Sequence, residues 1–124
     1  MSEDYEMDRS AEELSQAVVG HKIIGVGKAD TSGWRDPGIV LALDNGQQVV
    51  VRGSGSCCAY TDIDSWVFDI DKVDNVITKV EAADNYETWS IMAGADKVLG
   101  MDVSWGEGSG YYMYGFKIEV ERWN

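Results

Sequence analysis

The chain has 124 residues, of which 44% are hydrophobic and 26% are charged, and this balance excludes a wholly disordered protein. Its formal net charge of -12 excludes direct, non-specific binding to DNA or RNA, because an acidic surface repels the phosphate backbone. No apolar run approaches the roughly 20 residues of a membrane-spanning helix, and the acidic start does not resemble a signal peptide, so we expect a cytoplasmic protein.

The negative charge is concentrated in two segments. Residues 1–13 contain six acidic residues against one arginine, and residues 61–75 contain five acidic residues against one lysine. Segments of this kind attract a basic protein through complementary charge. The simpler interpretation is that an acidic surface keeps a small protein soluble.

The first predicted element is a helix. Residues 10–13 (Ser-Ala-Glu-Glu) have the form of a capping box, in which the serine and the last glutamate satisfy each other's backbone amides at a helix start. Apolar residues then repeat at helical spacing: Leu14, Ala17 and Val18. Gly20 is a natural left-handed stop, so the pattern predicts a helix over about residues 10–19.

A β-hairpin is predicted next, over residues 38–53. Asn45-Gly46 can occupy the two positive-φ positions of a two-residue type I′ turn, which would place Leu41 opposite Val50. One face would carry Ile39, Leu41, Leu43 and Val50, and the other would carry Val40, Ala42, Val49 and Val51. Because both faces are apolar, we expect both to be covered, one by the helix or a second sheet and the other by further protein such as another subunit.

Alternating apolar and polar residues predict the remaining strands. These strands cover residues 22–28, 76–81, 87–93, 99–105 and 112–121, and a glycine-rich loop over residues 106–110 joins the last two. The predicted fold is α+β and mainly β: a short N-terminal helix packed on a strongly bent antiparallel sheet or partly open barrel of about seven strands. We expect an acidic flexible N-terminus over residues 1–9 and a single globular domain over residues 10–124.

The two cysteines of the chain, Cys57 and Cys58, are adjacent. Adjacency does not suit a tetrahedral zinc site, whose cysteines are usually two to four residues apart. His21 is the only histidine in the sequence, so it is the only imidazole that could complete such a site. We interpret the pair as two small, reduced and buried thiols where a glycine-rich loop enters the core. A vicinal disulfide or a reactive thiol beside Arg52 remains an alternative.

The aspartates of residues 61–75 resemble a calcium loop only superficially. An EF-hand needs glycine at the sixth position, but that position is Val67 when counted from Asp62 and Asp74 when counted from Asp69. We expect these aspartates to cap turns and short helical segments around Trp66 and Phe68.

Catalytic groups are sparse in this sequence. His21 lies in the presumed turn from helix to strand without an evident nucleophile as partner. The glycine-rich segments 53–56 and 106–110 lack the lysine and the strand-loop-helix context of a phosphate-binding loop. Nothing singles out two carboxylates as a glycosidase pair. We therefore expect a non-enzymatic protein with no catalytic residues, no cofactor and no metal.

Aromatic and arginine side chains provide the candidate ligand residues: Trp34, Arg35, Arg52, Trp105, Tyr111 and Tyr112. The aromatic faces would stack on a base and the arginines would hold a phosphate, which together suit a small nucleotide-like ligand. The alternative is that aromatic residues, including Trp66, Trp89 and Tyr112, fill the core of a small β-domain.

Several segments occur in an order that indicates a family. They are HKIIGVGKAD, LALDNGQQVVV, the cysteine pair before an aromatic and acidic stretch, VDNVITKVE and GEGSGYYMYGFKIEV. Over about residues 18–121 the chain resembles a family of small bacteriophage proteins of unknown function, especially those of phages that infect actinobacteria. The resemblance implies a phage origin and a soluble accessory role. In size the chain is also similar to the Thoeris anti-defence proteins, which sequester cyclic nucleotide-like signals between subunits.

Three functions follow as hypotheses. The favoured one is a non-enzymatic phage accessory protein of the host cytoplasm that binds a small nucleotide-like signal or a host factor in host takeover or counter-defence. The second is an acidic module, comparable to a DNA mimic, that engages a basic host protein through residues 1–13 and 61–75. The third is a minor structural protein of the phage. In each case we expect a homo-oligomer that binds neither nucleic acid nor a membrane.

Overall fold

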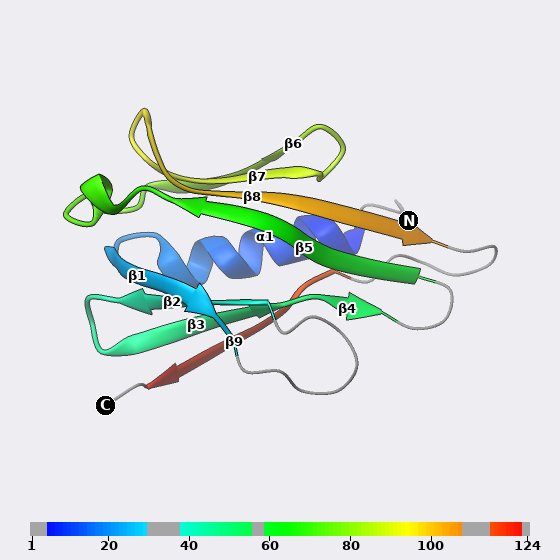
Figure 1. Cartoon of the computed structure of the whole chain (residues 1–124), viewed down its shortest axis with the longest axis horizontal. Coiled ribbons are helices and arrows are strands. Elements are labelled where there is room, and N and C mark those ends of the chain that lie inside the picture. The colour runs from blue at the N-terminus through cyan, green and yellow to red at the C-terminus, as the bar shows by residue number, and fades with distance from the viewer. Residues whose placement is uncertain (1–4, 30–37, 56–58, 108–114, 123–124) are drawn as a thin grey trace.

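One helix and two antiparallel sheets make up the described part of the chain (Figure 1). The computed structural model describes residues 5–29, 38–55, 59–107 and 115–122. The helix is α1 (Tyr5–Val18), and a short 3-10 helix, η1 (Ile70–Lys72), follows later in the chain. This architecture confirms the predicted class, a mainly β fold with a short N-terminal helix.

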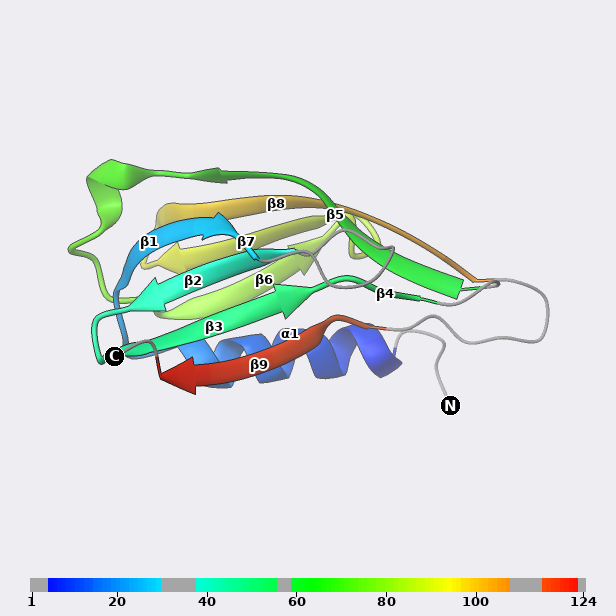
Figure 2. The same ribbon diagram turned by 60° about the horizontal axis from the view of Figure 1, so that its bottom comes forward.

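The strands form two sheets rather than one bent sheet. The four-stranded sheet has the order β1 (Ile23–Lys28), β2 (Ile39–Leu43), β3 (Gln47–Arg52) and β9 (Lys117–Arg122). The five-stranded sheet has the order β4 (Ser54–Gly55), β5 (Ala59–Phe68), β8 (Asp96–Glu107), β7 (Thr88–Ala93) and β6 (Lys79–Ala83). The sheets enclose one hydrophobic core, and α1 lies along one side, where it contacts the edge strands β6 and β9 (Figure 2). Among the described strands neither sheet closes into a barrel.

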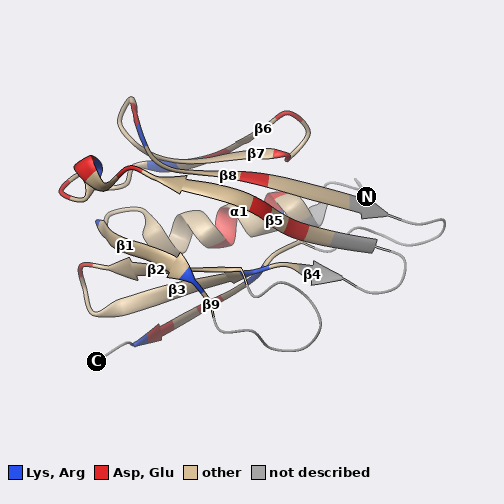
Figure 3. Ribbon diagram, viewed as in Figure 1, with Lys and Arg blue, Asp and Glu red and all other residues tan. Residues whose placement is uncertain are grey.

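Charged residues occur on α1 and on both sheets (Figure 3). The ion pairs between described side chains include Arg9–Glu13, Arg52–Glu119, Lys72–Asp96 and Lys79–Glu81. All of these side chains are at least partly exposed, so each pair contributes at most about 1 kcal/mol to stability. Packing of the apolar core therefore provides most of the stability of the fold.

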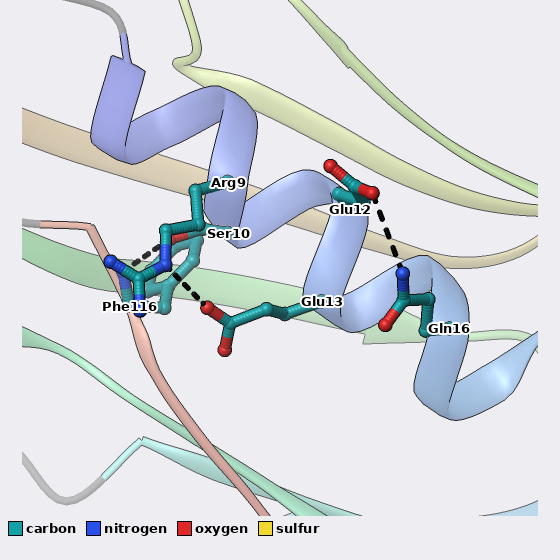
Figure 4. A network of polar contacts seen from close by, with 6 residues as sticks. All are labelled: Arg9, Ser10, Glu12, Glu13, Gln16 and Phe116. Atoms are coloured by element: carbon teal, nitrogen blue, oxygen red, sulfur yellow. Dashed lines mark hydrogen bonds and ion pairs between the residues drawn. The ribbon is translucent and has the colours of Figure 1, made fainter.

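The helix begins earlier than its sequence signal predicts. α1 begins at Tyr5, so residues 5–9, which were expected to be flexible, are helical. The residues that α1 buries recur at intervals of three or four and form one face: Met7, Ser10, Leu14 and Val18. Ser10 is inside the helix and does not cap it. Its Oγ instead accepts the backbone N–H of Phe116 at 2.8 Å, next to the Arg9–Glu13 ion pair on the helix surface (Figure 4). The predicted capping box is therefore wrong, because a distant strand takes up the serine hydroxyl.

The Ser10 hydroxyl is expected to matter for stability. Ser10→Ala leaves the buried Phe116 N–H without its acceptor, which costs about 1–3 kcal/mol in the free energy of unfolding. Ser15→Ala, on a more exposed part of the same helix, is the matched control and should change stability by less than about 0.5 kcal/mol. Urea denaturation followed by circular dichroism measures both values. Equal midpoints for the two variants would contradict the structural role of Ser10.

The β2–β3 hairpin exists as predicted but with a different register. Leu41 pairs with Val49, not with Val50, so the turn contains one more residue than a two-residue turn. Of the turn residues only Gly46 has a positive φ (82°), and the Asn45 side chain accepts the Gln47 backbone N–H at 3.0 Å. This is the pattern of a three-residue loop that ends in a left-handed glycine.

The shifted register changes which residues face the core. The buried face consists of Ile39, Leu41, Leu43, Val49 and Val51. The opposite face is less completely covered, since Val40 and Ala42 are half-buried and only Val50 is buried. The expectation that both faces are covered therefore holds fully for the inner face and only partly for the outer face.

Other strand predictions differ in accuracy. Strands β1 and β7 match their predicted ranges to within one residue, and β8 contains its predicted range but extends beyond it at both ends. β6 begins three residues later than predicted. The predicted last strand is shortened to β9, and its residues 112–114 lie outside the described part of the chain. β4 and β5 were not predicted as strands. In β5 a β-bulge between Ile63 and Ser65 shifts the inward-facing residues from odd to even numbers and so breaks the alternation.

The capping role expected of the aspartates is confirmed at η1. The side chain of Asp69 accepts the backbone N–H of Asp71 at 3.0 Å and caps this short helix. In the described residues no helix is long and apolar enough to cross a membrane.

Candidate interaction surface

Three carboxylates lie on the outward face of the five-stranded sheet and its β6–β7 turn. Each accepts a hydrogen bond from a hydroxyl group: Asp64 from Ser104 (2.9 Å), Asp102 from Ser65 (2.9 Å) and Asp84 from Thr88 (3.0 Å). Asp102 pairs with Ser65 of β5 on one side and with Thr88 of β7 on the other, so the three pairs follow one another across neighbouring strands. We call Asp64, Asp102 and Asp84 the acidic row.

The acidic row lies on the side of the sheet that faces away from the core. Its pairs alternate along the strands with inward residues, such as Met101 on β8 and Trp89 on β7, which are buried in the core. All three carboxylate residues are exposed. The acidic segments of β5 and β8 lie side by side in the ribbon (Figure 3).

The β-bulge in β5 explains how two consecutive residues reach the same face. Successive residues of a regular strand point to opposite faces. Asp64 and Ser65 instead both bond to β8, to Ser104 and Asp102, which are two residues apart and share a face. The extra residue of the bulge thus directs a second polar side chain to the outside.

The three carboxylates of the acidic row are bonded to hydroxyl groups rather than to cations. Within the described residues, none of its three carboxylates forms an ion pair, and a hydroxyl donor orients a carboxylate without neutralising it. The described side chains also include no cluster of three or more His, Cys, Asp or Glu residues placed to hold a metal ion.

A hollow of about 600 Å³ adjoins the acidic row on the sheet. Gly100 is one of its lining residues and pairs with Val67 of β5. Val67 and Ile70, which also line the hollow, are 75% and 68% exposed. Asp102 belongs both to the hollow and to the acidic row. Among the described residues, Lys97 is the one cationic side chain in the lining of this hollow. The surface therefore combines exposed apolar side chains with a net negative charge.

The turn that carries Asp84 has an unusual backbone. Asp84, Asn85 and Tyr86 all have positive φ values, 53°, 57° and 65°. A left-handed conformation costs roughly 1–2 kcal/mol for each residue that has a Cβ atom, and it is least expected for tyrosine. Two indole N–H groups hold this turn, since Trp105 donates to the Asn85 carbonyl at 2.6 Å and Trp89 donates to the Tyr86 carbonyl at 2.8 Å.

A further contact ties this turn to the helix. The hydroxyl of Tyr86 donates to the carboxylate of Asp8 on α1. The turn is thus held from the core by two indoles and from α1 by a carboxylate. These three hydrogen bonds hold the strained backbone that places Asp84 at one end of the acidic row.

The candidate ligand residues from the sequence are only partly described. Trp34, Arg35, Tyr111 and Tyr112 lie outside the described residues, as do Cys57 and Cys58. Arg52 is on β3 of the four-stranded sheet, and its Nε lies 3.8 Å from Oε1 of Glu119. Trp105 is on β8 of the five-stranded sheet, packs against the core and bonds to Asn85. The two described members thus lie in different sheets, each engaged with another residue.

The acidic segments predicted from sequence are divided by the fold. Asp64 contributes to the acidic row, Asp69 caps η1, and Glu13 on α1 pairs with Arg9. Asp84 and Asp102, which complete the row, lie outside both predicted segments. The alternation of β8 contained a signal for Asp102, because its apolar neighbours occupy the opposite face.

His21 lies in the turn from α1 to β1, as expected from the sequence. Its Nδ1 is 3.6 Å from Oδ1 of Asp44. This geometry is that of a surface contact between two turns.

A comparison with protein-family models assigns the chain to a family. A model described as a domain of unknown function (DUF7448) matches residues 16–118, which is most of the sequence. The chain belongs to the DUF7448 family. The DUF7448 match includes β1–β8 with the whole acidic row and the hollow, whereas most of α1 precedes it. No curated protein and no solved structure matches the chain.

Proposed function

We propose that this DUF7448 protein is a non-enzymatic interaction module whose acidic row and adjoining hollow bind a basic partner protein. The observation that carries this proposal is the set of three exposed, oriented carboxylates without a described cation partner, next to two highly exposed apolar side chains. In the phage setting that the sequence resemblance implies, the partner is a basic host protein and the role is host takeover or counter-defence.

Electrostatics and apolar burial act together in this arrangement. The net negative charge of the acidic row accelerates encounter with a positively charged partner and disfavours acidic ones. Val67 and Ile70 supply apolar surface that a partner removes from water, while the acidic row provides a charged rim. Neighbouring strands are about 4.8 Å apart, so the row extends roughly 10 Å from β5 to β7, a length that two or three Lys or Arg side chains can cover.

A small nucleotide-like ligand, favoured by the sequence, gains less support from the described residues. The acidic row repels phosphate, and Trp105 uses its indole N–H to hold the β6–β7 turn. Arg52, the described cation of that hypothesis, lies beside Glu119. A basic protein is therefore the partner whose chemistry best matches the described surface.

The binding proposal is tested with a double variant that neutralises two carboxylates of the acidic row. Asp64→Asn with Asp102→Asn keeps the shape and an acceptor for each hydroxyl but removes two negative charges from the acidic row. Its control, Glu12→Gln with Asp74→Asn, removes the same charge from exposed sites elsewhere. A basic protein captured from host lysate by the wild type is identified, purified and titrated against all three proteins.

We expect the row variant to weaken binding at least about tenfold and the control to change it less than about twofold. Binding should also fall as the salt concentration rises. Equal weakening by both variants would show a general charge effect and contradict the assigned surface. In 1 M salt, charges are screened over a distance of about 3 Å. Retention of the partner in 1 M salt would therefore contradict an electrostatic interface.

A further inference from the structure

Within the described residues, the edge strand β9 has backbone hydrogen-bonding groups that no other strand uses. β9 pairs with β3 and is the last of the described strands in its sheet. The backbone N–H of Phe116, just before the strand, points away from β3 and donates to Ser10 of α1. Because N–H and C=O groups of alternate residues point to the same side, those of Ile118 and Val120 also face away from β3. These two residues therefore present a template for another strand.

The apolar side chains at this edge are only partly covered. Ile118 lies opposite Val51 and Val120 lies opposite Val49, so both belong to the face that carries the core residues of β3. Ile118 is half-buried, and Val120 remains 50% exposed. An added strand would remove this exposed apolar area from water.

A groove of about 350 Å³ provides room for such a strand beside the first half of β9. It is lined by Arg9, Ser10 and Glu13 of α1 and by residues 116–119 of the edge. Ser10 bonds to Phe116, and beyond this contact the residues from Glu119 to Arg122 are exposed. With respect to the described residues, α1 thus lies across the groove from the first half of β9, and the second half of the strand is exposed.

We propose that β9 pairs with β9 of a second copy of this chain, antiparallel and centred on Glu119, to join two four-stranded sheets into one. The sequence of β9, Lys-Ile-Glu-Val-Glu-Arg, is self-complementary in this register. Lys117 lies opposite Glu121 of the second copy, twice by symmetry, and Ile118 lies opposite Val120 of the second copy. The outward backbone groups of Ile118 and Val120 then form the hydrogen-bonded pairs.

Charge also favours this register over its neighbour. Centring the pair on Val120 would instead place Glu119 opposite Glu121 of the second copy on both sides of the axis, which is repulsive. In the proposed register only the two Glu119 side chains meet, at the symmetry axis. Each of them lies 3.8 Å from the Nε of its own Arg52, which offsets their repulsion. Because five residue pairs form a small interface, we expect a dimer that dissociates at about micromolar concentrations.

A charge-swap series tests the dimer. Sedimentation equilibrium over roughly 1–500 µM should show a monomer–dimer equilibrium for the wild type. Lys117→Glu places like charges opposite each other, and so does Glu121→Lys, so each should weaken dimerisation at least about tenfold. The double variant Lys117→Glu with Glu121→Lys restores opposite charges and should restore the dimer.

Val120→Pro provides an independent test of the backbone pairing. Since the Val120 N–H faces away from β3, proline removes a hydrogen bond of the proposed dimer without removing one from the β3–β9 ladder. We expect a folded monomer by circular dichroism and sedimentation. A wild type that stays monomeric at about 500 µM overturns the proposal, as does a dimer that Val120→Pro and the single charge swaps leave unchanged.

Discussion

Trp89→Ala is expected to destabilise the protein by about 3–5 kcal/mol, a large share of the total stability of a chain of this size. Trp89 is fully buried, and its ring packs edge-to-face against Phe116 with 5.0 Å between ring centroids. Its indole N–H also holds the strained β6–β7 turn through the Tyr86 carbonyl. The substitution therefore opens a cavity in the core and releases a turn whose backbone conformation is unfavourable on its own.

Two conservative variants separate these contributions. Trp89→Phe keeps most of the apolar ring but loses the donor to Tyr86, so its cost should be about half that of the alanine variant. Trp105→Phe removes the corresponding donor to Asn85 from a half-buried ring and should cost about 1–2 kcal/mol. Urea unfolding followed by circular dichroism measures all three. A loss below about 1 kcal/mol for Trp89→Ala would contradict the position of this ring in the core.

Gly38→Ala is expected to have the second large effect. Gly38 has a φ of 93°, and a Cβ atom there would lie 2.0 Å from the Val51 carbonyl oxygen of β3. No real Cβ atom approaches a backbone oxygen so closely, so β2 and β3 would have to separate at this point. The expected loss is more than about 3 kcal/mol, with a lowered melting temperature as the readout.

Gly20→Ala is the matched control for this substitution. Gly20 has a similar φ of 89°, but a Cβ atom there meets nothing within 4 Å. Its cost is the left-handed backbone strain alone, about 1–2 kcal/mol. The difference between the two melting temperatures therefore measures the steric clash with β3. Equal losses at the two positions would show that Gly38 is needed only for its φ angle.

Local patterns in the sequence were sufficient for many elements of the fold. The apolar stripe that includes Leu14 and Val18 predicted the helix, and simple alternation predicted β1, β7 and β8. The reason is that these elements each bury one face, so the residue period shows directly in the sequence. Asn45 and Gly46 likewise marked a hairpin, because few residues tolerate the backbone conformations of a tight turn.

Predictions were wrong where a local signal competed with a distant partner. Ser10 has the sequence context of a helix cap, yet its hydroxyl bonds to Phe116, which is more than a hundred residues away in the chain. The register of the β2–β3 hairpin also depended on burial, since the turn with one more residue places Val49 and Val51 in the core. In β5 the bulge at Asp64 reversed the alternation on which strand prediction relies.

By itself the sequence determined the fold class, the acidity of the surface and the positions of most turns, because these follow from composition and short-range periodicity. Only the tertiary structure decided how the strands divide into two sheets and which carboxylates meet. Asp64, Asp84 and Asp102 are separated by about twenty residues each and come together through the pairing of β5, β7 and β8. Such pairing depends on contacts between distant segments, which no local pattern of residues records.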